Sequence, residues 1–539
     1  MKARPLPWLA AICTVIVLYR APCAAADFAV DMPAALRHTL ESGAPVIGPN
    51  GKPVPTENLA EFYAQRQGQP LWVDPSGLNG RGQALVAKLR EADRDGLDPA
   101  EYVVGDPPSA AAGIDRLAVS EIALSATLLR YANDVRRGRA TPGKMDAEQR
   151  VTPKPIDSAA QLLTGAAEAA DLPVFIDRLA PADPFYRGLR TALDRYRAVE
   201  AAGGWPQIGA GPRLDTGSTG PRVRALRQHL LLTGDLPPER QVRSPDRFDE
   251  ELREGVKRFQ QRHGLGADGA VGGGTQTALD VPVGARIRQI KANLERARWL
   301  PEDLGDPYVL VNMAAFQLEV VEAGLPVLEM RVVIGERDKE TPAFSDFISY
   351  IEINPYWNVP RSIAVKEKLP QLRRNPSALA AQNIRVLTAG GEQINPASID
   401  WSTVGDNFPY RLRQDPGGRN ALGRIKFMFP NPYDVYMHDT PSRALFNRPV
   451  RAFSHGCIRV EKPMELAEFL LRRNGGWSRD RIQNLIDAGK NRPLTLSPPV
   501  PVHLIYLTAW LGADGTVQFR DDLYNRDARL VAALDAVSE

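Results

Sequence analysis

The hydrophobic pattern of this chain changes its period once, and that change limits the folds that its 539 residues can adopt. Up to a segment that ends at Trp299, apolar residues recur mainly at helical spacing. From Tyr308 onward they mostly alternate, as in strands that bury one face. A chain of this length is also too long for a single hydrophobic core. We therefore expect a multidomain α+β protein in which helical domains precede a mostly-β domain.

The helical half divides into two predicted domains. Residues 27–207 are rich in Ala, Leu, Arg and Glu at helical spacing, and predict a mostly helical scaffold domain. A Gly-rich stretch at residues 201–220 then predicts a linker or entry loop. Residues 212–282 predict a compact three-helix domain, whose second helix ends at Gly264 before a turn at residues 268–272.

The alternating half predicts one sheet-rich domain over residues 305–510, followed by a C-terminal extension at residues 511–539. Between residues 361 and 410 the alternation stops, and this polar segment contains one predicted helix near residues 366–372. An insertion of this kind in a sheet domain predicts a lid. The segments predicted as strands are 308–313, 316–322, 327–334, 347–353, 425–429, 435–438 and 502–507.

Residues 1–26 have the pattern of a secretory signal peptide. Two basic residues precede an apolar run from Trp8 to Leu18, and Ala24 to Ala26 supply small residues for cleavage. The run is shorter than the roughly 20 residues that span a bilayer, which argues against an uncleaved anchor. Lipidation at Cys23 is disfavoured because Arg20 stands where an aliphatic residue is wanted. We expect export to the periplasm, with no transmembrane segment after cleavage.

Charge and ligand spacing disfavour two other classes of function. A net charge of +3, from 67 basic and 64 acidic side chains, gives no reason to expect a nucleic-acid partner. Two histidines near one cysteine, without a second cysteine or an acidic ligand at suitable spacing, are a weak zinc pattern. We therefore predict neither a metal nor a cofactor.

Cys457 is the only cysteine that remains after the predicted cleavage, because Cys13 and Cys23 lie in the signal peptide. A lone thiol in an oxidising compartment is open to oxidation and intermolecular pairing, so its retention suggests that the thiol takes part in a reaction. The alternative interpretation is a small buried hydrophobic residue. The residues around Cys457 have to decide between the two.

A catalytic cysteine needs a base, donors for the oxyanion and partial exposure, because the thiolate is the form that attacks a carbonyl. Gly456 permits a tight turn that can aim its own N–H and that of Cys457 at one point. His438 ends a predicted strand, from which its side chain can project toward this loop, and is the predicted base. The competing base, His455, is poorly placed two residues before Cys457 on a tight turn, so we assign it to loop packing and hydrogen bonding.

The run Ser454-His455-Gly456-Cys457-Ile458-Arg459-Val460, with His438 upstream in a Tyr-x-His-Asp context, resembles the signature of YkuD-like L,D-transpeptidase catalytic domains. The resemblance covers about residues 308–508. It implies a β-sandwich in which Cys457 is the nucleophile and His438 accepts and donates the proton. It also implies that the backbone carbonyl of Asp439, and not its carboxylate, orients the histidine ring.

Two further resemblances concern the other domains. The pattern from Val256 to Thr275, including Phe259-Gln260-x-x-His263-Gly264-Leu265, resembles peptidoglycan-binding domains of the three-helix type, although it also fits a module that only packs. The order of the domains resembles that of large periplasmic transpeptidases of the YcbB type. Residues 354–360 and 522–527 resemble that type as well, which implies that residues 361–410 form a substrate-capping subdomain.

The resemblance implies a reaction between donor and acceptor stems of peptidoglycan. Cys457 attacks the third, diamino-acid residue of a tetrapeptide stem, expels D-Ala and forms a thioester, and the amine of a second stem then completes a 3-3 cross-link. Activating cell-wall proteins are further candidate partners. The candidate substrate-binding residues are Phe427, Tyr433, Tyr436, Ser454, His455 and Arg459.

Several alternatives remain open on the sequence. With water or a protein amine as acceptor, the same thioester chemistry makes an L,D-carboxypeptidase or attaches a protein to peptidoglycan. A non-catalytic cell-wall-binding scaffold is the alternative from another class. Arg459 can meet a substrate carboxylate bidentately or form a structural salt bridge.

Overall fold

The computed structural model describes residues 21–48, 51–102, 113–146, 148–150, 154–238 and 244–538. Contacts along the chain define two compact units, the first with residues 1–137 and 155–181, the second with residues 138–154 and 182–539. Most of the predicted signal peptide lies outside the described residues, and helix α1 (Ala21–Glu41) begins near its end. Within the described ranges, no helix is long and apolar enough to cross a membrane.

The first unit is helical and is built around the long helix α4 (Ile114–Arg137). Along α4, residues such as Ile122, Leu128 and Val135 are buried in the core of this unit. The other elements of the first unit are α1, α2 (Ala60–Gln65), β1 (Val73–Asp74), β2 (Gly77–Leu78), α3 (Gly80–Leu89), η1 (Ala92–Asp95), η2 (Pro99–Glu101), α6 (Ala159–Glu168) and α7 (Leu172–Asp177).

A buried carboxylate joins α4 to the segment before β1. Glu121 is fully buried, and its two oxygens accept hydrogen bonds from the backbone N–H groups of Leu71, Trp72 and Val73 and from the hydroxyl of Tyr63. Burial nevertheless raises the pKa of Glu121 to about 7, because it disfavours the charged form more strongly than these donors favour it.

The predicted boundary at residue 207 does not separate the helical scaffold from the rest of the chain. Helices α5 (Pro142–Met145) and α8 (Pro184–Ala201) belong to the second unit, where α8 packs along α12 (Val283–Arg298) and against β16 (Ala509–Leu511). A Cβ on Gly188 of α8 would stand 2.7 Å from the side chain of Leu511. Helical spacing predicts such a helix but does not show which core it joins.

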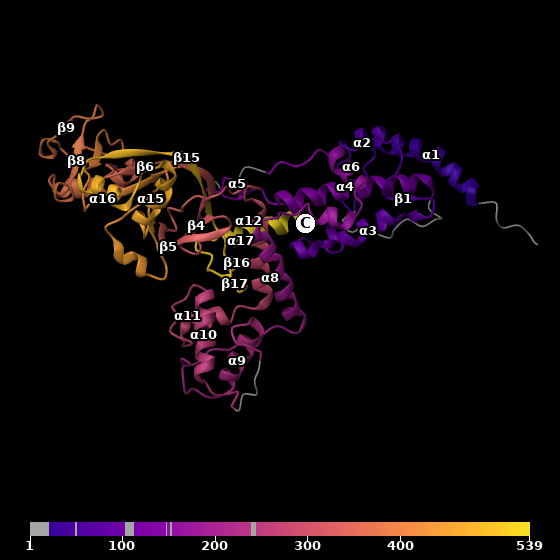
Figure 1. Ribbon diagram of the computed structural model, residues 1–539, viewed down its shortest axis with the longest axis horizontal. Helices are drawn as coiled ribbons and strands as arrows, with labels where there is room; N and C mark the ends of the chain where they lie inside the picture. Colours follow the sequence, from indigo (N-terminus) through magenta and orange to yellow (C-terminus); the bar gives the residue numbers. More distant parts are fainter. Residues whose placement is uncertain are drawn as a thin grey trace, which may run out of the picture. The chain divides into compact units, whose positions relative to one another are not determined.

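The three-helix domain that the sequence predicts is present. It consists of α9 (Pro221–Thr233), α10 (Glu250–Arg262) and α11 (Gly273–Leu279), which lie together in Figure 1. Leu226, Phe248 and Phe259 are among the residues of its own hydrophobic core. The carboxylate of Asp249 caps α10 by accepting a hydrogen bond from the N–H of Leu252 at 2.9 Å.

The mostly-β domain contains a nine-stranded sheet in the order β13-β5-β14-β12-β11-β6-β15-β3-β4. Because β4 also pairs with β5, the strands of the predicted sandwich belong to one sheet that closes on itself. Helices α15 (Pro463–Leu471) and α16 (Arg479–Asp487) pack together and contribute to its core (Figure 1). The strands are β3 (Tyr308–Asn312), β4 (Gln317–Glu322), β5 (Leu325–Gly335), β6 (Phe344–Ile353), β11 (Ile425–Met428), β12 (Met437–His438), β13 (Ala452–Ser454), β14 (Ile458–Val460) and β15 (Arg492–Ile505).

The insertion is a folded subdomain with its own four-stranded sheet, in the order β7-β10-β8-β9, which the sequence pattern did not predict. Its sheet runs beyond the predicted limits of 361–410, from Trp357 to Gln414, and it has a separate core around Trp401. Strands of two to four residues are too short for alternation to reveal them. The elements are β7 (Trp357–Asn358), α13 (Arg361–Ile363), the π-helix η3 (Ala364–Lys368), α14 (Leu369–Arg374), η4 (Ala380–Gln382), β8 (Ile384–Leu387), β9 (Gln393–Ile394), η5 (Pro396–Ser398) and β10 (Arg411–Gln414).

The segment predicted as a C-terminal extension is integrated into the second unit. It contains most of a hairpin of β16 and β17 (Val517–Phe519) and ends in α17 (Arg526–Ser538). The ring of Phe519 stacks on that of His263 in the three-helix domain, with centroids 5.5 Å apart. The buried guanidinium of Arg526 forms ion pairs with Asp146 and Glu340. Because these contacts join residues that are distant in sequence, no local sequence pattern could predict them.

Candidate active site

Adjacent strands bring the candidate catalytic residues to one face of the sheet. Strand β12 pairs with β11 and, in parallel, with β14, so that Lys426, His438 and Arg459 stand in register. Because side chains alternate along a strand, Tyr436 and Cys457 lie on the same face. The adjacent residue on each strand faces the opposite side and is fully buried. These residues are Phe427 on β11, Met437 on β12 and Ile458 on β14.

A cavity of about 580 Å³ lies over this face, between the sheet and the insertion. It brings together His438, Cys457 and five of the six predicted substrate-binding residues, namely Tyr433, Tyr436, Ser454, His455 and Arg459. The beginning of the insertion, from the residue before β7 into α13, forms another part of the wall, namely Tyr356, Trp357, Asn358, Val359, Pro360, Ser362 and Ile363.

Phe427 does not line this cavity, so its predicted role in the acyl site is wrong. Its side chain is fully buried in the hydrophobic core of the sheet. The preceding residue of β11, Lys426, lines the cavity instead. Its ammonium lies 3.9 Å from the ring centroid of Tyr436 and 3.9 Å from a carboxylate oxygen of Glu352. The sequence interpretation took the wrong face of a short strand.

A hydrogen bond to the backbone fixes the imidazole of His438. Its Nδ1 lies 2.5 Å from the backbone carbonyl of Asp439, and because a carbonyl can only accept, Nδ1 carries the proton. Nε2 is then the nitrogen that can accept one. Burial lowers the pKa of His438 to about 3, and the positive charges of Arg459 and Lys426 act in the same direction.

The carboxylate of Asp439 is occupied elsewhere. One oxygen accepts the N–H of Arg424 at 2.9 Å, and the other accepts the N–H of Thr440 at 2.7 Å. The bond from Arg424 ties the end of β12 to the residue before β11. The contact of Asp439 with the imidazole is therefore made by its backbone carbonyl.

Cys457 borders the cavity while protein atoms enclose most of its thiol. Its Sγ lies 3.9 Å from the backbone carbonyl of Asp434, a residue with a positive φ of 53°. Burial raises the pKa of the thiol, and the backbone N–H and hydroxyl of Tyr436, followed by Lys426 and Arg459, oppose that rise. Both pKa shifts favour a neutral thiol and a neutral imidazole over an ion pair.

The loop before Cys457 is closed by its own hydrogen bonds. Gly456 has φ of +110°, a conformation that favours glycine. Its N–H donates to Ser454 Oγ at 3.2 Å, and that hydroxyl donates to the carbonyl of Cys457 at 2.5 Å. The N–H of Gly456 therefore already has a partner in this loop, and its role as an oxyanion donor stays a prediction. The N–H of Cys457 has no hydrogen-bond partner among the described residues and remains available.

The imidazole of His455 contacts the insertion. Its Nε2 is paired with the carboxylate of Glu367, which lies on the π-helix η3. This contact joins the loop of Cys457 to the subdomain that covers the cavity. With Nε2 so engaged, His455 is a weaker candidate for the base than His438.

Two residues that the sequence interpretation did not identify support the loop. The hydroxyl of Thr341 donates to the carbonyl of Gly456 at 2.8 Å. The hydroxyl of Tyr524 donates to the carbonyl of Gly335 at 2.7 Å and accepts the N–H of Thr341 at 3.3 Å. Tyr524 lies in the segment 522–527 that the family resemblance had singled out, whereas Thr341 had no sequence signal.

Arg459 stands beside Cys457 without an ion-pair partner within 4.0 Å in the described part of the chain, so a structural salt bridge does not account for it. Its Nε is buried and makes no hydrogen bond.

No group of three or more His, Cys, Asp or Glu side chains among the described residues could hold a metal ion.

Three family models match parts of the chain. Residues 306–491 match the L,D-transpeptidase catalytic domain, of the YkuD family. Residues 219–279 match a family described as "Putative peptidoglycan binding domain", and residues 57–193 match a family described as "Scaffold domain".

A curated protein of Haemophilus influenzae, named "Putative L,D-transpeptidase", is 35% identical over 243 residues. The match covers 45% of this chain and 49% of that protein, about half the length of each. An L,D-transpeptidase structure from Xylanimonas cellulosilytica is 18% identical, with 55% of this chain and 99% of that chain covered and a TM-score of 0.17. One from Stackebrandtia nassauensis is 14% identical, with coverages of 54% and 94% and a TM-score of 0.22.

Proposed function

Because this chain carries an L,D-transpeptidase catalytic domain of the YkuD family and a peptidoglycan-binding domain, we propose that it is a periplasmic enzyme that forms 3-3 cross-links between peptide stems through a thioester on Cys457. One observation carries the proposal. Cys457 and a neutral His438, oriented by the carbonyl of Asp439, lie on one face of the sheet and line one cavity.

The first half-reaction forms the acyl-enzyme. His438 Nε2 accepts the thiol proton as Cys457 Sγ attacks the carbonyl of the third residue of the donor stem. The N–H of Cys457 is the donor available to the developing oxyanion. When the tetrahedral intermediate collapses, the C–N bond to the terminal D-Ala breaks, and His438 returns its proton to the leaving amine. The product is a thioester between the stem and Cys457.

The second half-reaction reverses these roles. The side-chain amine of an acceptor stem attacks the thioester carbonyl, and His438 accepts a proton from this amine. The C–S bond then breaks, an amide forms between the two stems, and the proton returns to the sulfur. Because the pKa of His438 lies near 3, its imidazole is neutral and ready to accept a proton throughout the neutral pH range.

The two cations of the cavity suit a negatively charged substrate. Lys426 and Arg459 flank Cys457 and stabilise both the thiolate and the oxyanion as these form. The unpartnered guanidinium of Arg459 is the group that we assign to a stem carboxylate. Tyr433 and Tyr436 supply apolar wall for the stem, and the His455–Glu367 contact holds the insertion over it.

The proposal is tested by mass spectrometry of the purified protein with a tetrapeptide donor. We expect an adduct of the tripeptide acyl group on the wild-type protein and none on Cys457→Ala with its fold intact. His438→Ala should slow acylation by about 10²-fold or more. The matched variant His455→Ala should be affected less. An adduct on Cys457→Ala would refute the proposal, and a larger loss in His455→Ala would move the role of base to that residue.

The acyl acceptor is decided by analysis of the products. Dimers joined between the two third residues support cross-linking, whereas free tripeptide stems alone would indicate a carboxypeptidase. Stems attached to protein amines would indicate protein anchoring. If the intact protein formed no adduct with any donor but still bound peptidoglycan, the non-catalytic scaffold would be the better conclusion.

A further inference from the structure

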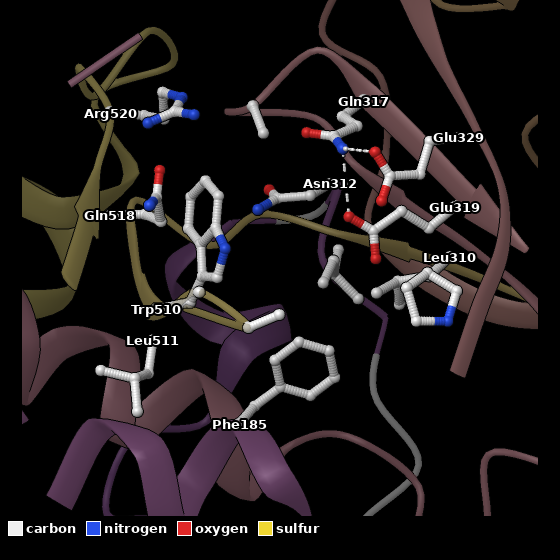
Figure 2. A pocket seen from close by; sticks show the side chains of 15 residues that line it. Phe185, Leu310, Asn312, Gln317, Glu319, Glu329, Trp510, Leu511, Gln518 and Arg520 are labelled. Atoms are coloured by element: carbon white, nitrogen blue, oxygen red, sulfur yellow. Dashed lines mark hydrogen bonds between the residues drawn. The ribbon is translucent and has the colours of Figure 1, made fainter. Parts of the chain in front are cut away.

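A second cavity, of about 270 Å³, lies in the same unit and shares no lining residue with the active-site cavity. Strands β3, β4 and β5 form one side, and the hairpin of β16 and β17 with the beginning of α8 forms the other (Figure 2). The first side is acidic, with Glu319 and Glu329. The second side is aromatic, with Phe185 and Trp510.

The acidic wall consists of two carboxylates that face each other across a strand pair. Glu319 of β4 and Glu329 of β5 are direct partners in the antiparallel ladder, and the amide of Gln317 donates to Glu319 at 3.2 Å and to Glu329 at 3.5 Å. Like charges placed opposite each other destabilise a sheet. The ammonium of Lys462 donates to the backbone carbonyl of Glu329 at 2.9 Å, but no Lys, Arg or His nitrogen among the described residues lies within 4.0 Å of a carboxylate oxygen of either glutamate. Burial raises the pKa of Glu319, and Glu329 raises it further.

The opposite wall combines aromatic side chains with polar ones that are held in place. Trp510 and Phe185 lie across the cavity from Glu319 in Figure 2, with the side chain of Asn312 between them. The amide of Asn312 is fixed by the backbone of Leu507, at 3.1 Å for each of its two bonds. Arg520 lies over the ring of Trp510 at 4.8 Å. Its guanidinium donates to the carbonyls of Arg262 and Phe519, and it forms no ion pair with Glu319 or Glu329.

This combination selects a ligand class. A protonated amine would neutralise the opposed carboxylates, and its alkyl chain would pack on Trp510 and Phe185. An anion would be repelled, and a neutral sugar would leave the repulsion between the carboxylates unrelieved. The volume is below the roughly 300–1,000 Å³ of ordinary small-molecule sites, and therefore suits one side chain.

We propose that this cavity binds the side-chain ammonium of a diamino acid on a peptidoglycan stem, at a site separate from the catalytic one. The stem is favoured as the carrier because the hairpin that forms the aromatic wall adjoins the peptidoglycan-binding domain, where Arg520 donates to the carbonyl of Arg262 at 2.9 Å. The choice of a stem rests on the proposed function, whereas the choice of an alkylammonium rests on the cavity alone.

Calorimetry with the full-length Cys457→Ala protein tests the inference, because this variant cannot use an amine as acyl acceptor. The probes are a tripeptide stem with a free side-chain amine, the same stem with that amine acetylated, and an Nα-acetyl-lysine peptide. We expect the free-amine stem to bind and Glu319→Gln to weaken it at least tenfold. Glu392→Gln, which changes an exposed glutamate of the insertion, is the matched control and should leave binding unchanged.

A fold check accompanies the binding data. Glu319→Gln removes one of two like charges, so its melting temperature should equal or exceed that of the parent protein. Equal binding of the free and acetylated stems, or unchanged binding in Glu319→Gln, would overturn the inference. Tighter binding of the lysine peptide would overturn the stem as carrier and indicate a protein partner. Cross-linking by the wild-type protein is measured separately, so loss of amine binding and loss of the proposed function are distinct results.

Discussion

The hydroxyl of Thr341 donates a hydrogen bond of 2.8 Å to the backbone carbonyl of Gly456, the residue that precedes the thiol-bearing Cys457. The same hydroxyl accepts the N–H of Gly335 at 2.9 Å. Because the N–H of Thr341 donates to Tyr524, one threonine connects the end of β5, the C-terminal segment and the loop of the nucleophile. The conformation of this loop therefore depends on residues far from it in sequence.

Thr341→Val should slow acylation by about tenfold. Valine has nearly the same shape but cannot donate to Gly456, so the N–H of Cys457 loses its fixed direction, and small errors of position are costly in a catalytic site. The lost hydrogen bond should lower the free energy of unfolding by only about 1 kcal/mol. Thr341→Ser keeps the hydroxyl and should retain most activity. Equal acylation rates for the two variants, measured by intact-protein mass spectrometry, would contradict this role.

Lys426→Met should make Cys457 less reactive. The ammonium of Lys426 lowers the pKa of the thiol against the rise caused by burial, so its removal leaves less thiolate at a given pH. We expect alkylation by iodoacetamide at pH 7 to slow roughly three- to tenfold, and the pH profile of alkylation to move toward alkaline pH. Lys490→Met, on the exposed surface, is the control. An unchanged pH profile in Lys426→Met would refute this effect.

Part of this site could be predicted from the sequence, and the failures have physical causes. The short run around Cys457 and the Tyr-x-His-Asp context led to residues that do share a cavity, and the predicted contact of Asp439 through its carbonyl is present, while their catalytic roles stay predictions. Phe427 was predicted to line the acyl site, where Lys426 lies, because alternation in a strand of four residues does not say which face is the core. The oxyanion role of Gly456 stays a prediction, because its N–H bonds the nearby Ser454, a detail of loop conformation that the sequence does not show.

The domain organisation, too, could be predicted only in part from the sequence. Long helices and long strands, such as α12 and β5, are visible in hydrophobic spacing because many residues repeat the pattern. The four-stranded sheet of the insertion has no such signal, since its strands have two to four residues. The membership of α8 in the second unit depends on its packing against α12, a contact between distant segments that no local spacing can show.

Asp439→Asn should separate the backbone role of this residue from that of its carboxylate. The variant keeps the carbonyl that orients His438 and retains one side-chain acceptor for the N–H of Arg424 or Thr440. We expect acylation to fall less than tenfold, compared with about 10²-fold or more for His438→Ala. A loss in Asp439→Asn as large as that in His438→Ala would mean that the carboxylate takes part in catalysis.

The stability of the first unit should fall as the pH rises, because of Glu121. The folded-state pKa of Glu121 is about 7, above the ordinary 4.5, so the folded state holds the proton more tightly than the unfolded state. The stability linked to this group is therefore fully present below about pH 4.5 and is lost as the pH rises through 7. The pKa difference between the folded and unfolded states corresponds to about 3 kcal/mol in the free energy of unfolding.

Thermal unfolding of the first unit, followed between pH 5 and 8, measures this pH dependence. Glu121→Gln should remove this component of the pH dependence, whereas the exposed Glu61→Gln should keep it. An identical slope in wild type and Glu121→Gln would show that the buried carboxyl is ionised throughout this range.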